Sequence, residues 1–508
     1  MKLKDLIKGI PTKSIKGSLE LEVSGISYDS RKAGPGDLFV CIPGTKDDGH
    51  KYVKQARERG VVGFLASREV EAEAGQVVVA VEEPRLEMGK LASRLAGEPC
   101  RKMEMVAITG TNGKTTISYF IEAITAAQGK ECGVIGTISH RWKGREIPAN
   151  NTTPESVDVI GYLTGMKKAG VSRVAMEVSS HALDQKRVAG IAFCAGIFTN
   201  LTPEHLDYHK NMENYFSAKA RLFTEVLPGK WLLEKIDYEP VAAINLDDDY
   251  GKRLFEITKC RKAGYALKNP AQYQGEILEH GWAGIKLKMK SPAGEFMLQS
   301  PLLGRINAYN ILAAASALME LGTRPEQVVK GVKALRQVPG RMERVENDKG
   351  FLVLVDYAHT PDALENAVSI ANELKKNRLV LVFGCGGDRD RTKRPKMGEI
   401  GARNAEFLIV TSDNPRTEDP LAIIAEIKPG VEKTGFKKLA KPGNGPKGWM
   451  VEPDRRSAIE MALASAKEGD CVLIAGKGHE DYQILGDRKI HFDDREEVRR
   501  VLGAKGTR

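Results

Sequence analysis

The chain has little of what marks secreted, membrane-spanning or base-stacking proteins. Aromatic residues make up 6% of its 508 residues, and no run of 18 apolar residues occurs. The seven cysteines form no C-x-x-C pair and are odd in number. These absences argue against a transmembrane helix, a disulfide framework, a cysteine-based zinc site and an aromatic nucleic-acid groove, and they favour a reducing compartment.

The positive charge is spread along the chain and does not form one basic tract. Lys and Arg number 77 against 67 Asp and Glu, a net charge of +10, and the densest cluster, residues 388–396, also contains aspartates. A basic surface of this kind favours anionic small molecules over nucleic acid as ligands. The opening segment MKLKDLIKGIPTK has one short apolar patch and no small-residue cleavage site, so we expect a cytoplasmic protein without a secretory signal.

The length exceeds what one hydrophobic core usually supports. Polar stretches at residues 96–102 and 337–340 separate three predicted domains: an N-terminal domain over 1–98, a central domain over 99–338 and a C-terminal domain over 339–508. Short apolar runs alternate with longer helical stretches, which is typical of parallel α/β folds.

Seven polar motifs directly follow predicted strands. The strands are expected at residues 105–109, 174–177, 194–199, 351–355, 379–383, 407–411 and 471–475. Open α/β sheets bind their ligands at the carboxyl ends of the strands. The seven placements therefore predict two catalytic parallel sheets that face a shared cleft.

The motif GTNGKTT after the first of these strands predicts a phosphate-binding loop. Backbone N–H groups and a helix N-terminus would face the anion, Lys114 would reach the outer phosphates of ATP, and the Thr115 hydroxyl could ligate Mg²⁺. The spacing departs from the usual motif, because Ile108 and not glycine stands five residues before Gly113. A tight strand-to-helix turn is the plainer alternative, and kinases, ATPases and ligases all stay open at this point.

This compressed loop resembles that of the Mur ligase family and its folylpolyglutamate synthetase relatives. Further motifs match the family in order over nearly the whole chain, most closely those members that add the third residue of the cell-wall stem peptide: DSRKAGPGDLF, SSHALDQKR, AKARLF, GRINAYNILAA, DYAHTPDAL, DNPR and GKGHEDYQ. The resemblance implies an α/β protein with a central P-loop-type parallel sheet, a C-terminal Rossmann-like parallel sheet and a smaller N-terminal α/β domain for a uridine nucleotide.

The resemblance also implies an ATP-dependent, ADP-forming ligase of peptidoglycan precursor synthesis. Its small-molecule partners would be ATP, UDP-N-acetylmuramoyl-L-alanyl-D-glutamate and meso-diaminopimelate, with Mg²⁺ as cofactor. The γ-carboxylate of the D-glutamate would be activated as an acyl phosphate, which the incoming amine attacks. We expect no nucleic-acid partner, no membrane insertion and a monomer.

By position, the resemblance assigns residues to each ligand. For ATP it implies Gly110, Thr111, Asn112, Gly113, Lys114, Thr115, Thr116, Asn307, Asn310, Arg341 and Asp356. For the UDP-muramoyl dipeptide it implies Tyr28, Ser30, Thr45, Lys46, Asp47, Asn151, Thr152, Thr153, Ser179, Gln185 and Arg187. For Mg²⁺ it implies Thr115, Glu177, His205 and Lys219, the last as a CO₂-derived carbamate.

Residue type alone leaves plainer alternatives open for several of these positions. Ser30 and Asp47 could simply hold turns, and Lys219 could be an ordinary helical lysine. Arg187 could be a solvated helix charge, and His205 a structural histidine. Since Arg341 and Asp356 lie beyond the second boundary, the resemblance implies that ATP is enclosed by the central and C-terminal domains, with domain closure during turnover.

The motif DNPR at 413–416 is the most discriminating in the chain. Family members that add meso-diaminopimelate carry it, and this amino acid differs from lysine by a second carboxylate, which a planar guanidinium answers with two charge-assisted hydrogen bonds. A turn after a strand is the plainer alternative. For the amino-acid site the resemblance implies Arg389, Asp413, Asn414, Pro415, Arg416, Gly476 and Glu480.

Four rival functions are considered at this stage. One, a nucleic-acid P-loop ATPase, would need a basic groove with aromatic residues, which make up only 6% of the chain. A lysine-adding ligase would differ at DNPR, a folylpolyglutamate synthetase should lack both DNPR and the uridine segment, and an ATP-gated binding module would not need amino-acid-site residues. The group that removes the proton from the attacking amine also stays open, with His181, His359 and the substrate phosphate as candidates.

Overall fold

The computed structural model describes residues 1–44, 47–440 and 447–503. The chain folds into two compact units. Unit 1 contains Met1–Gly275, Met289–Phe296 and Tyr309–Val332, and unit 2 contains Glu276–Lys288, Met297–Ala308 and Lys333–Arg508. The boundaries of three domains at 1–98, 99–338 and 339–508 stay a prediction. None of the helices in the described ranges is long and apolar enough to cross a membrane.

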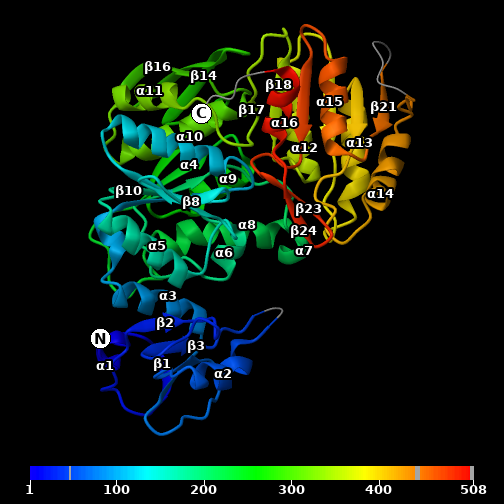
Figure 1. The fold of residues 1–508 in the computed structure, drawn as a ribbon. Helices are drawn as coiled ribbons and strands as arrows, with labels where there is room; N and C mark the ends of the chain where they lie inside the picture. Colours follow the sequence, from blue (N-terminus) through cyan, green and yellow to red (C-terminus); the bar gives the residue numbers. More distant parts are fainter. Residues whose placement is uncertain (45–46, 441–446, 504–508) are drawn as a thin grey trace. The chain divides into compact units, whose positions relative to one another are not determined.

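Unit 1 begins with a 5-stranded sheet in the order β1-β5-β4-β3-β2 (Figure 1). Strands β2 to β5 run parallel and β1 pairs antiparallel with β5. The bounds are β1 Thr12–Lys16, β2 Gly25–Ser27, β3 Asp37–Val40, β4 Gly63–Ala66, β5 Val77–Val81, α1 Leu3–Leu6, η1 Gly49–Tyr52, α2 Val53–Glu58, α3 Pro84–Leu95 and η2 Pro99–Lys102. Helix α3 starts at a proline, whose missing N–H costs nothing at a first helical position.

An 11-stranded sheet follows, and its parallel middle has the order β7-β10-β6-β11-β12-β13. The strands are β6 Glu104–Thr109, β7 Cys132–Ile135, β8 Ser139–Trp142, β9 Arg145–Pro148, β10 Arg173–Glu177, β11 Ala195–Phe198, β12 Val241–Asn245, β13 Arg261–Ala266, β14 Tyr273–Gly281, β15 Gly284–Ser291 and β16 Gly294–Ser300. The helices are α4 Lys114–Ala127, α5 Ser156–Lys168, α6 Ser180–Asp184, α7 Leu206–His209, α8 Met212–Arg221, η3 Leu222–Val226, α9 Asp249–Ile257, α10 Ile306–Glu320 and α11 Pro325–Ala334.

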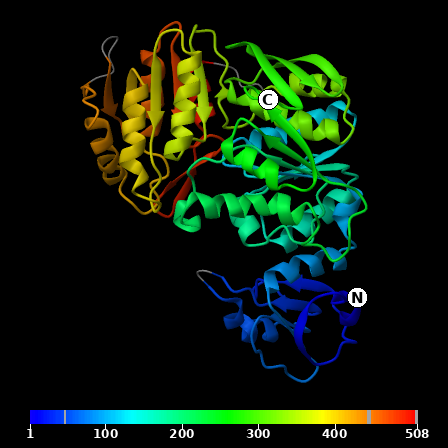
Figure 2. The same ribbon diagram turned by 180° about the vertical axis from the view of Figure 1, so that it is seen from behind.

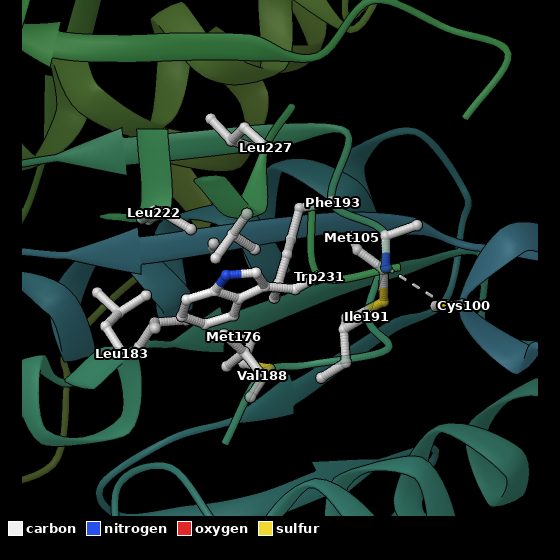
Figure 3. Close-up of a cluster of buried hydrophobic side chains, with 14 of the residues drawn as sticks. Cys100, Met105, Met176, Leu183, Val188, Ile191, Phe193, Leu222, Leu227 and Trp231 are labelled. Atoms are coloured by element: carbon white, nitrogen blue, oxygen red, sulfur yellow. Dashed lines mark hydrogen bonds between the residues drawn. The ribbon is translucent and has the colours of Figure 1, made fainter. Parts of the chain in front are cut away.

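The central strand β6 is apolar and buried from Met105 to Ile108, as expected for a parallel sheet covered by helices on both faces. On one face its Met105 joins a buried cluster that includes Met176, Phe193, Leu222 and Trp231 (Figure 3). Because the cluster joins β6 and β10 to the segment before β11, it fixes the strands whose carboxyl ends carry the predicted motifs.

Unit 2 contains a 6-stranded sheet in the order β17-β18-β22-β19-β20-β21, parallel except for β17. The strands are β17 Glu343–Arg344, β18 Leu352–Asp356, β19 Leu379–Phe383, β20 Phe407–Val410, β21 Gly448–Val451 and β22 Cys471–Ala475, with a separate hairpin of β23 Tyr482–Leu485 and β24 Arg488–His491. The helices are α12 Pro361–Leu374, α13 Lys393–Asn404, α14 Pro420–Glu432, α15 Arg455–Ser465 and α16 Asp494–Leu502.

Alternate residues of this sheet enter two different cores. Leu381 and Leu473 point to the side of α12, α13 and α14, whereas Val382 and Ile474 point to the side of α15 and α16. Figures 1 and 2 show the two helical layers from opposite directions. Strands buried on both faces explain the continuous apolar runs in the sequence.

A strand lies at each of the seven predicted positions, with ends within one residue of those expected. Three of these strands, β6, β10 and β11, belong to the 11-stranded sheet, and β18, β19, β20 and β22 belong to the 6-stranded sheet. The prediction of parallel α/β architecture with two sheets that carry the motifs is therefore confirmed. The shared cleft stays a prediction.

Candidate functional site

The phosphate loop joins β6 to α4. Gly110 and Gly113 have φ values of 142° and 90°, and a Cβ atom on Gly110 would lie 1.8 Å from Oγ1 of Thr199. The Thr199 hydroxyl donates to the carbonyl of Asn112 at 2.7 Å, and the Asn112 N–H donates to Oδ1 of Asn200 at 3.0 Å. The residues after β11 thus hold the loop in a shape that only glycine permits at its start. Thr116, also predicted here, is buried in the first turn of α4.

Two lysine side chains meet at one backbone oxygen of this loop. Nζ of Lys114 donates to the carbonyls of Gly110 at 2.9 Å and Thr111 at 2.8 Å. Nζ of Lys219, from α8, donates to the same Gly110 carbonyl at 2.9 Å. Positive charge is therefore concentrated beside the N-terminus of α4, where anions are stabilised.

Lys219 is not an exposed helical lysine. It is 2% exposed, and its Nζ lies 4.6 Å from the centre of the Tyr215 ring. Burial, reinforced by the nearby charge of Lys114, holds the pKa of Lys219 well below the usual value for lysine. A readily deprotonated amine is what reaction with CO₂ requires.

Glu177, at the end of β10, accepts hydrogen bonds from threonines of two segments. Its Oε2 accepts from the hydroxyls of Thr115 at 3.1 Å and Thr137 at 2.8 Å, and its Oε1 accepts from the Thr137 N–H at 3.1 Å. The Thr137 hydroxyl also lies 3.0 Å from that of Thr152. Two of the predicted metal ligands, Thr115 and Glu177, thus come together.

These oxygens fit Mg²⁺, which commonly takes one or two carboxylates and completes its shell with water and phosphate. Among the described residues, no group of three or more His, Cys, Asp or Glu side chains could hold a metal ion. The His205 side chain is 44% exposed, with Nε2 3.7 Å from Oε2 of Glu204. The roles of His205 and Lys219 as ligands stay predictions.

The predicted residues for the peptide arm form a connected group beside Glu177. The Thr153 hydroxyl donates to the Glu177 carbonyl at 2.9 Å, and the Ser179 N–H donates to that hydroxyl at 3.1 Å. Nη1 of Arg187 donates to the Thr153 carbonyl at 3.1 Å, and its Nη2 donates to Oε1 of Gln185 at 2.6 Å. Arg187 is therefore anchored and not a solvated helix charge. Asn151 is exposed at the edge of the group.

Sequence reasoning missed two charged residues at this group. Oε1 of Glu155 lies 3.2 Å from Nε of Arg187 and 3.3 Å from Nη2 of Arg85, a residue of α3. Two guanidiniums around one carboxylate leave a net positive charge. Nothing in the sequence joins Arg85 to the others, because it lies about a hundred residues before Arg187.

The described N-terminal residues predicted to bind the uridine nucleotide each form a hydrogen bond with a different partner. The Tyr28 hydroxyl donates to Oδ2 of Asp158 at 2.5 Å, and the buried Ser30 hydroxyl donates to Oε1 of Gln55 at 2.6 Å. Oδ2 of Asp47 accepts from the Tyr52 hydroxyl at 2.5 Å. Thr45 and Lys46 lie outside the described residues.

Near Lys219 lies a cluster of aromatic rings with three histidines. The His181 ring lies 4.8 Å from that of His205, 4.3 Å from that of Tyr208 and 5.4 Å from that of His209, and the His209 ring stacks on Tyr215 at 5.1 Å. Burial, together with the neighbouring histidines, lowers the pKa of His181 to about 4. His181 is therefore neutral at pH 7.

The remaining nucleotide residues fall in both units. In unit 1, a Cβ atom on Gly113 would lie 2.5 Å from Oδ1 of the buried Asn310. In unit 2, Nδ2 of Asn307 donates to the Leu303 carbonyl at 2.7 Å. Also in unit 2, the Arg341 guanidinium lies 5.2 Å from the centre of the Tyr357 ring, and the Asp356 carboxylate accepts from two backbone N–H groups at 2.8 and 2.9 Å.

Arg416 lies in a tightly built loop after β20. Its Nη1 donates to the Gly387 carbonyl at 2.7 Å, and its φ of 54° is left-handed. The hairpin β23–β24 holds this backbone: the Arg416 N–H donates to the Ile484 carbonyl at 3.1 Å, and the Gly486 N–H donates to the Arg416 carbonyl at 2.8 Å. Arg416 is half-buried, and its guanidinium lies beside the glycines of the motif after β19.

The other residues of DNPR face the GKGHE segment after β22. Nδ2 of Asn414 donates to Oε2 of Glu480 at 2.8 Å, and the Cβ position of Gly476 lies 3.3 Å from Oδ2 of Asp413. The carbonyl of Pro415 lies 1.9 Å from the Cβ position of Gly387, so glycine is required there. The structure therefore brings Asp413, Asn414, Glu480 and Gly476 together.

Two further observations complete the amino-acid region. Arg389 is exposed, its Nη1 donates to the carbonyl of its own neighbour Asp388 at 3.0 Å, and its Cγ lies 4.0 Å from the Cβ position of Gly386, which Arg416 also contacts. Sequence reasoning missed Lys477, whose fully buried ammonium lies 3.6 Å from Oδ1 of Asp413 and 3.5 Å from Oε2 of Glu480. The signal was available, since Lys477 stands inside the GKGHE motif.

A phosphate loop on one parallel sheet and a buried cluster of paired charges on another are compatible with a nucleotide-dependent α/β ligase. Three family models cover most of the chain: "Mur ligase family, catalytic domain" matches residues 22–97, "Mur ligase middle domain" matches 108–318, and "Mur ligase, glutamate ligase domain" matches 340–478. The chain belongs to the Mur ligase family. Members of this family are ATP-dependent ligases of peptidoglycan precursor synthesis, and this chain is one of them.

Several of the most similar proteins share one name. The UDP-N-acetylmuramoyl-L-alanyl-D-glutamate–2,6-diaminopimelate ligase of Geobacter metallireducens is 46% identical, with 100% of both chains covered. The ligase of that name from Geobacter sulfurreducens is 44% identical, with 98% of both covered. A solved structure with the same name has a TM-score of 0.72 at 33% identity and covers 99% of each chain. These similarities confirm the family resemblance and the three-sheet α/β fold expected from it.

Proposed function

We propose that the protein uses ATP to join meso-diaminopimelate to the γ-carboxylate of D-glutamate in UDP-N-acetylmuramoyl-L-alanyl-D-glutamate. The observation that carries the amino-acid choice is the DNPR loop, where Asp413 and Asn414 lie against Lys477 and Glu480 and the half-buried Arg416 follows in the same loop. Meso-diaminopimelate has an ammonium and a carboxylate at its far end. The loop and its neighbours offer carboxylates for the ammonium and the Arg416 guanidinium for the carboxylate. The names of the relatives support the same choice.

The proposed reaction begins with transfer of a phosphoryl group. A γ-carboxylate oxygen of the D-glutamate bonds to the γ-phosphorus of ATP, the bond to the bridging oxygen breaks, and ADP leaves. Lys114 neutralises charge on the transferring group, and the N–H groups of residues 110–116 bind the other phosphates. Thr115 and Glu177 would hold Mg²⁺, which supplies charge neutralisation to phosphates when bound.

The acyl phosphate then meets the amine. The amine nitrogen bonds to the carbonyl carbon, the carbon–oxygen bond to phosphate breaks, and the nitrogen loses a proton. Catalysis comes mainly from positioning, so no serine or cysteine nucleophile is needed. His181 and His359 both have pKa values lowered by burial, and the departing phosphate is the third candidate for the proton acceptor.

The proposal includes the roles that remain predictions. Thr152, Thr153, Ser179, Gln185 and Arg187 would bind the peptide arm. Lys219 would react through its neutral amine with CO₂, losing a proton, to give an anionic carbamate beside His205. Arg389 and Gly476 would complete the amino-acid site, and Asn307, Asn310, Arg341 and Asp356 the nucleotide site. We further propose a monomer that works in the cytoplasm.

The deciding experiment measures ADP release with ATP, Mg²⁺ and the UDP-muramoyl dipeptide, adding meso-diaminopimelate or L-lysine in turn. We expect release with meso-diaminopimelate and at least about tenfold less with L-lysine, since Arg416 would lose its anion. Equal release with both would refute the role of Arg416. No release with either would refute the ligase.

The carbamate has its own test. Lys219→Ala should lose activity, and an added short carboxylic acid should restore part of it by supplying the missing anionic oxygens. Lys252→Ala, which removes an exposed lysine of α9, is the matched control and should behave as the wild type with and without the acid. Loss of activity without any restoration would count against the carbamate.

A further inference from the structure

Lys477 is a fully buried lysine whose ammonium is surrounded by side chains of the proposed amino-acid site. Its Nζ lies 3.3 Å from Oδ1 of Asn414, 3.5 Å from Oε2 of Glu480 and 3.6 Å from Oδ1 of Asp413. Lysine is almost never fully buried unless it is paired. Here its partners are residues that would touch the substrate.

Two carboxylates share the ammonium of Lys477. Among the described residues, Lys477 is the cation that lies within ion-pair distance of both Asp413 and Glu480. Another buried cation, Arg455, is engaged by both oxygens of Asp494 at 2.7 Å, and both of those side chains are 0% exposed. The two carboxylates therefore depend on one lysine for their ion pairs.

One carboxylate oxygen also lacks a hydrogen bond. Oδ1 of Asp413 is buried, and none of the described residues donates a hydrogen bond to it. Its distance to Lys477 is that of an ion pair without a hydrogen bond. A buried acceptor without a donor is costly unless a ligand supplies one.

Glu480 depends on Lys477 for its charge. Burial raises the pKa of Glu480, Lys477 lowers it, and the negative charge of Asp413 raises it again. The charged and titratable groups that face the cluster are Arg416, Arg455 with Asp494, Lys393, His359, Cys385, Tyr357 and Tyr482. Without Lys477, burial and the charge of Asp413 would raise the pKa of Glu480 with no ion-pair partner to oppose them.

We propose that Lys477 is a positioning residue of the amino-acid site: its ammonium holds the Asp413 and Glu480 carboxylates in place to receive an ammonium group of the incoming amino acid. The inference rests on the proposed function. It adds a residue that does not touch the substrate and acts through two that do.

The test compares Lys477→Met with the wild-type enzyme in the full reaction. We expect the KM for meso-diaminopimelate to rise roughly 10- to 100-fold, because two buried charges lose their partner. The KM values for ATP and for the UDP-muramoyl dipeptide should change less than about threefold. The acid limb of kcat/KM for meso-diaminopimelate should move to higher pH, because the pKa of Glu480 rises when Lys477 is absent.

The matched control is Lys375→Met. Lys375 is a half-buried lysine of unit 2 that caps the C-terminus of α12 and is paired with Glu406 at 2.7 Å. Glu406 accepts from the N–H of Leu379, the first residue of β19, so this pair lies at the opposite edge of the sheet. This variant should keep the wild-type KM for all substrates and the wild-type pH profile. A selective rise in the KM for meso-diaminopimelate in this control would overturn the inference.

A second pair of variants covers the case in which Lys477→Met does not fold. Lys477→Arg keeps the charge and should hold the acid limb within about half a pH unit of the wild type. Glu480→Gln should abolish the acid limb that Glu480 causes. An acid limb that moves in Lys477→Arg, or one unchanged in Glu480→Gln, would overturn the inference.

The outcomes separate this inference from the proposed function. A wild-type enzyme that releases no ADP with meso-diaminopimelate rejects both. An active wild-type enzyme with equal changes in all three KM values for Lys477→Met rejects the inference alone, because a purely structural role would affect the three substrates alike.

Discussion

In unit 1, the side-chain nitrogens of Lys114 and Lys219 both donate to the carbonyl of Gly110, whereas in unit 2 the buried cations Lys477 and Arg455 face carboxylates. A carbonyl carries only a partial charge, whereas a carboxylate carries a full one. Under the proposed function, the same edge of a parallel sheet serves phosphates in unit 1 and an amino acid in unit 2, and the two sites differ in how their lysines and arginines are held.

Breaking the buried Arg455–Asp494 pair of unit 2 should give the largest loss of stability. Arg455→Met leaves Asp494 buried without its partner, and we expect the free energy of unfolding of unit 2 to fall by about 3–5 kcal/mol. Denaturant unfolding measures this. Arg403→Met, which breaks an exposed pair with Glu399 on α13, is the control and should cost less than about 1 kcal/mol. Equal losses would show that burial does not distinguish the two pairs.

Removing a cation from unit 1 should affect catalysis more than folding. Lys114→Ala takes away the charge aimed at the transferring phosphoryl group, and we expect kcat to fall by about 10²–10³-fold, or about 3–4 kcal/mol. Steady-state ADP release measures kcat, and thermal unfolding should remain close to that of the wild type. A fall in kcat of less than tenfold would contradict the phosphate-binding role of the loop.

Arg416 tests the amino-acid side of the comparison. Arg416→Ala should raise the KM for meso-diaminopimelate by about 10- to 100-fold, because a charge-assisted hydrogen bond of about 1.5–3 kcal/mol is lost. The preference over L-lysine should fall with it. Arg403→Ala on the exposed face of α13 serves as the control. An unchanged preference would mean that another residue recognises the second carboxylate.

Replacing Lys219 should have the smallest effect on the free energy of unfolding. Its buried side-chain nitrogen donates to a carbonyl and not to a carboxylate, so Lys219→Met leaves no buried charge without a partner. We expect the free energy of unfolding to fall by no more than about 1 kcal/mol, or to rise. Unfolding in bicarbonate-free buffer measures this beside Arg455→Met. A loss as large as that of Arg455→Met would show that the two units hold their cations in the same way.

The sheets and the loop were predictable because their signals are local. Continuous apolar runs such as 379–383 mark strands buried on both faces, and GTNGKTT marks the loop that follows β6. Lys477 and Arg85 escaped notice for different reasons. Lys477 looked like one more polar residue of a known motif, and its burial depends on side chains from 413–414, whereas Arg85 reaches Glu155 only because α3 packs near the start of α5. Contacts of that kind depend on tertiary packing, which no local pattern reveals.

The left-handed backbone at Arg416 restricts what evolution or an engineer can place there. A β-branched residue at φ 54° would be strained, whereas asparagine and glycine adopt this region readily. A redesign for a different amino acid therefore cannot treat position 416 as a free choice of side chain. It must either keep a residue that tolerates this geometry or rebuild the β23–β24 hairpin as well, so acceptor specificity and loop shape would have to change together.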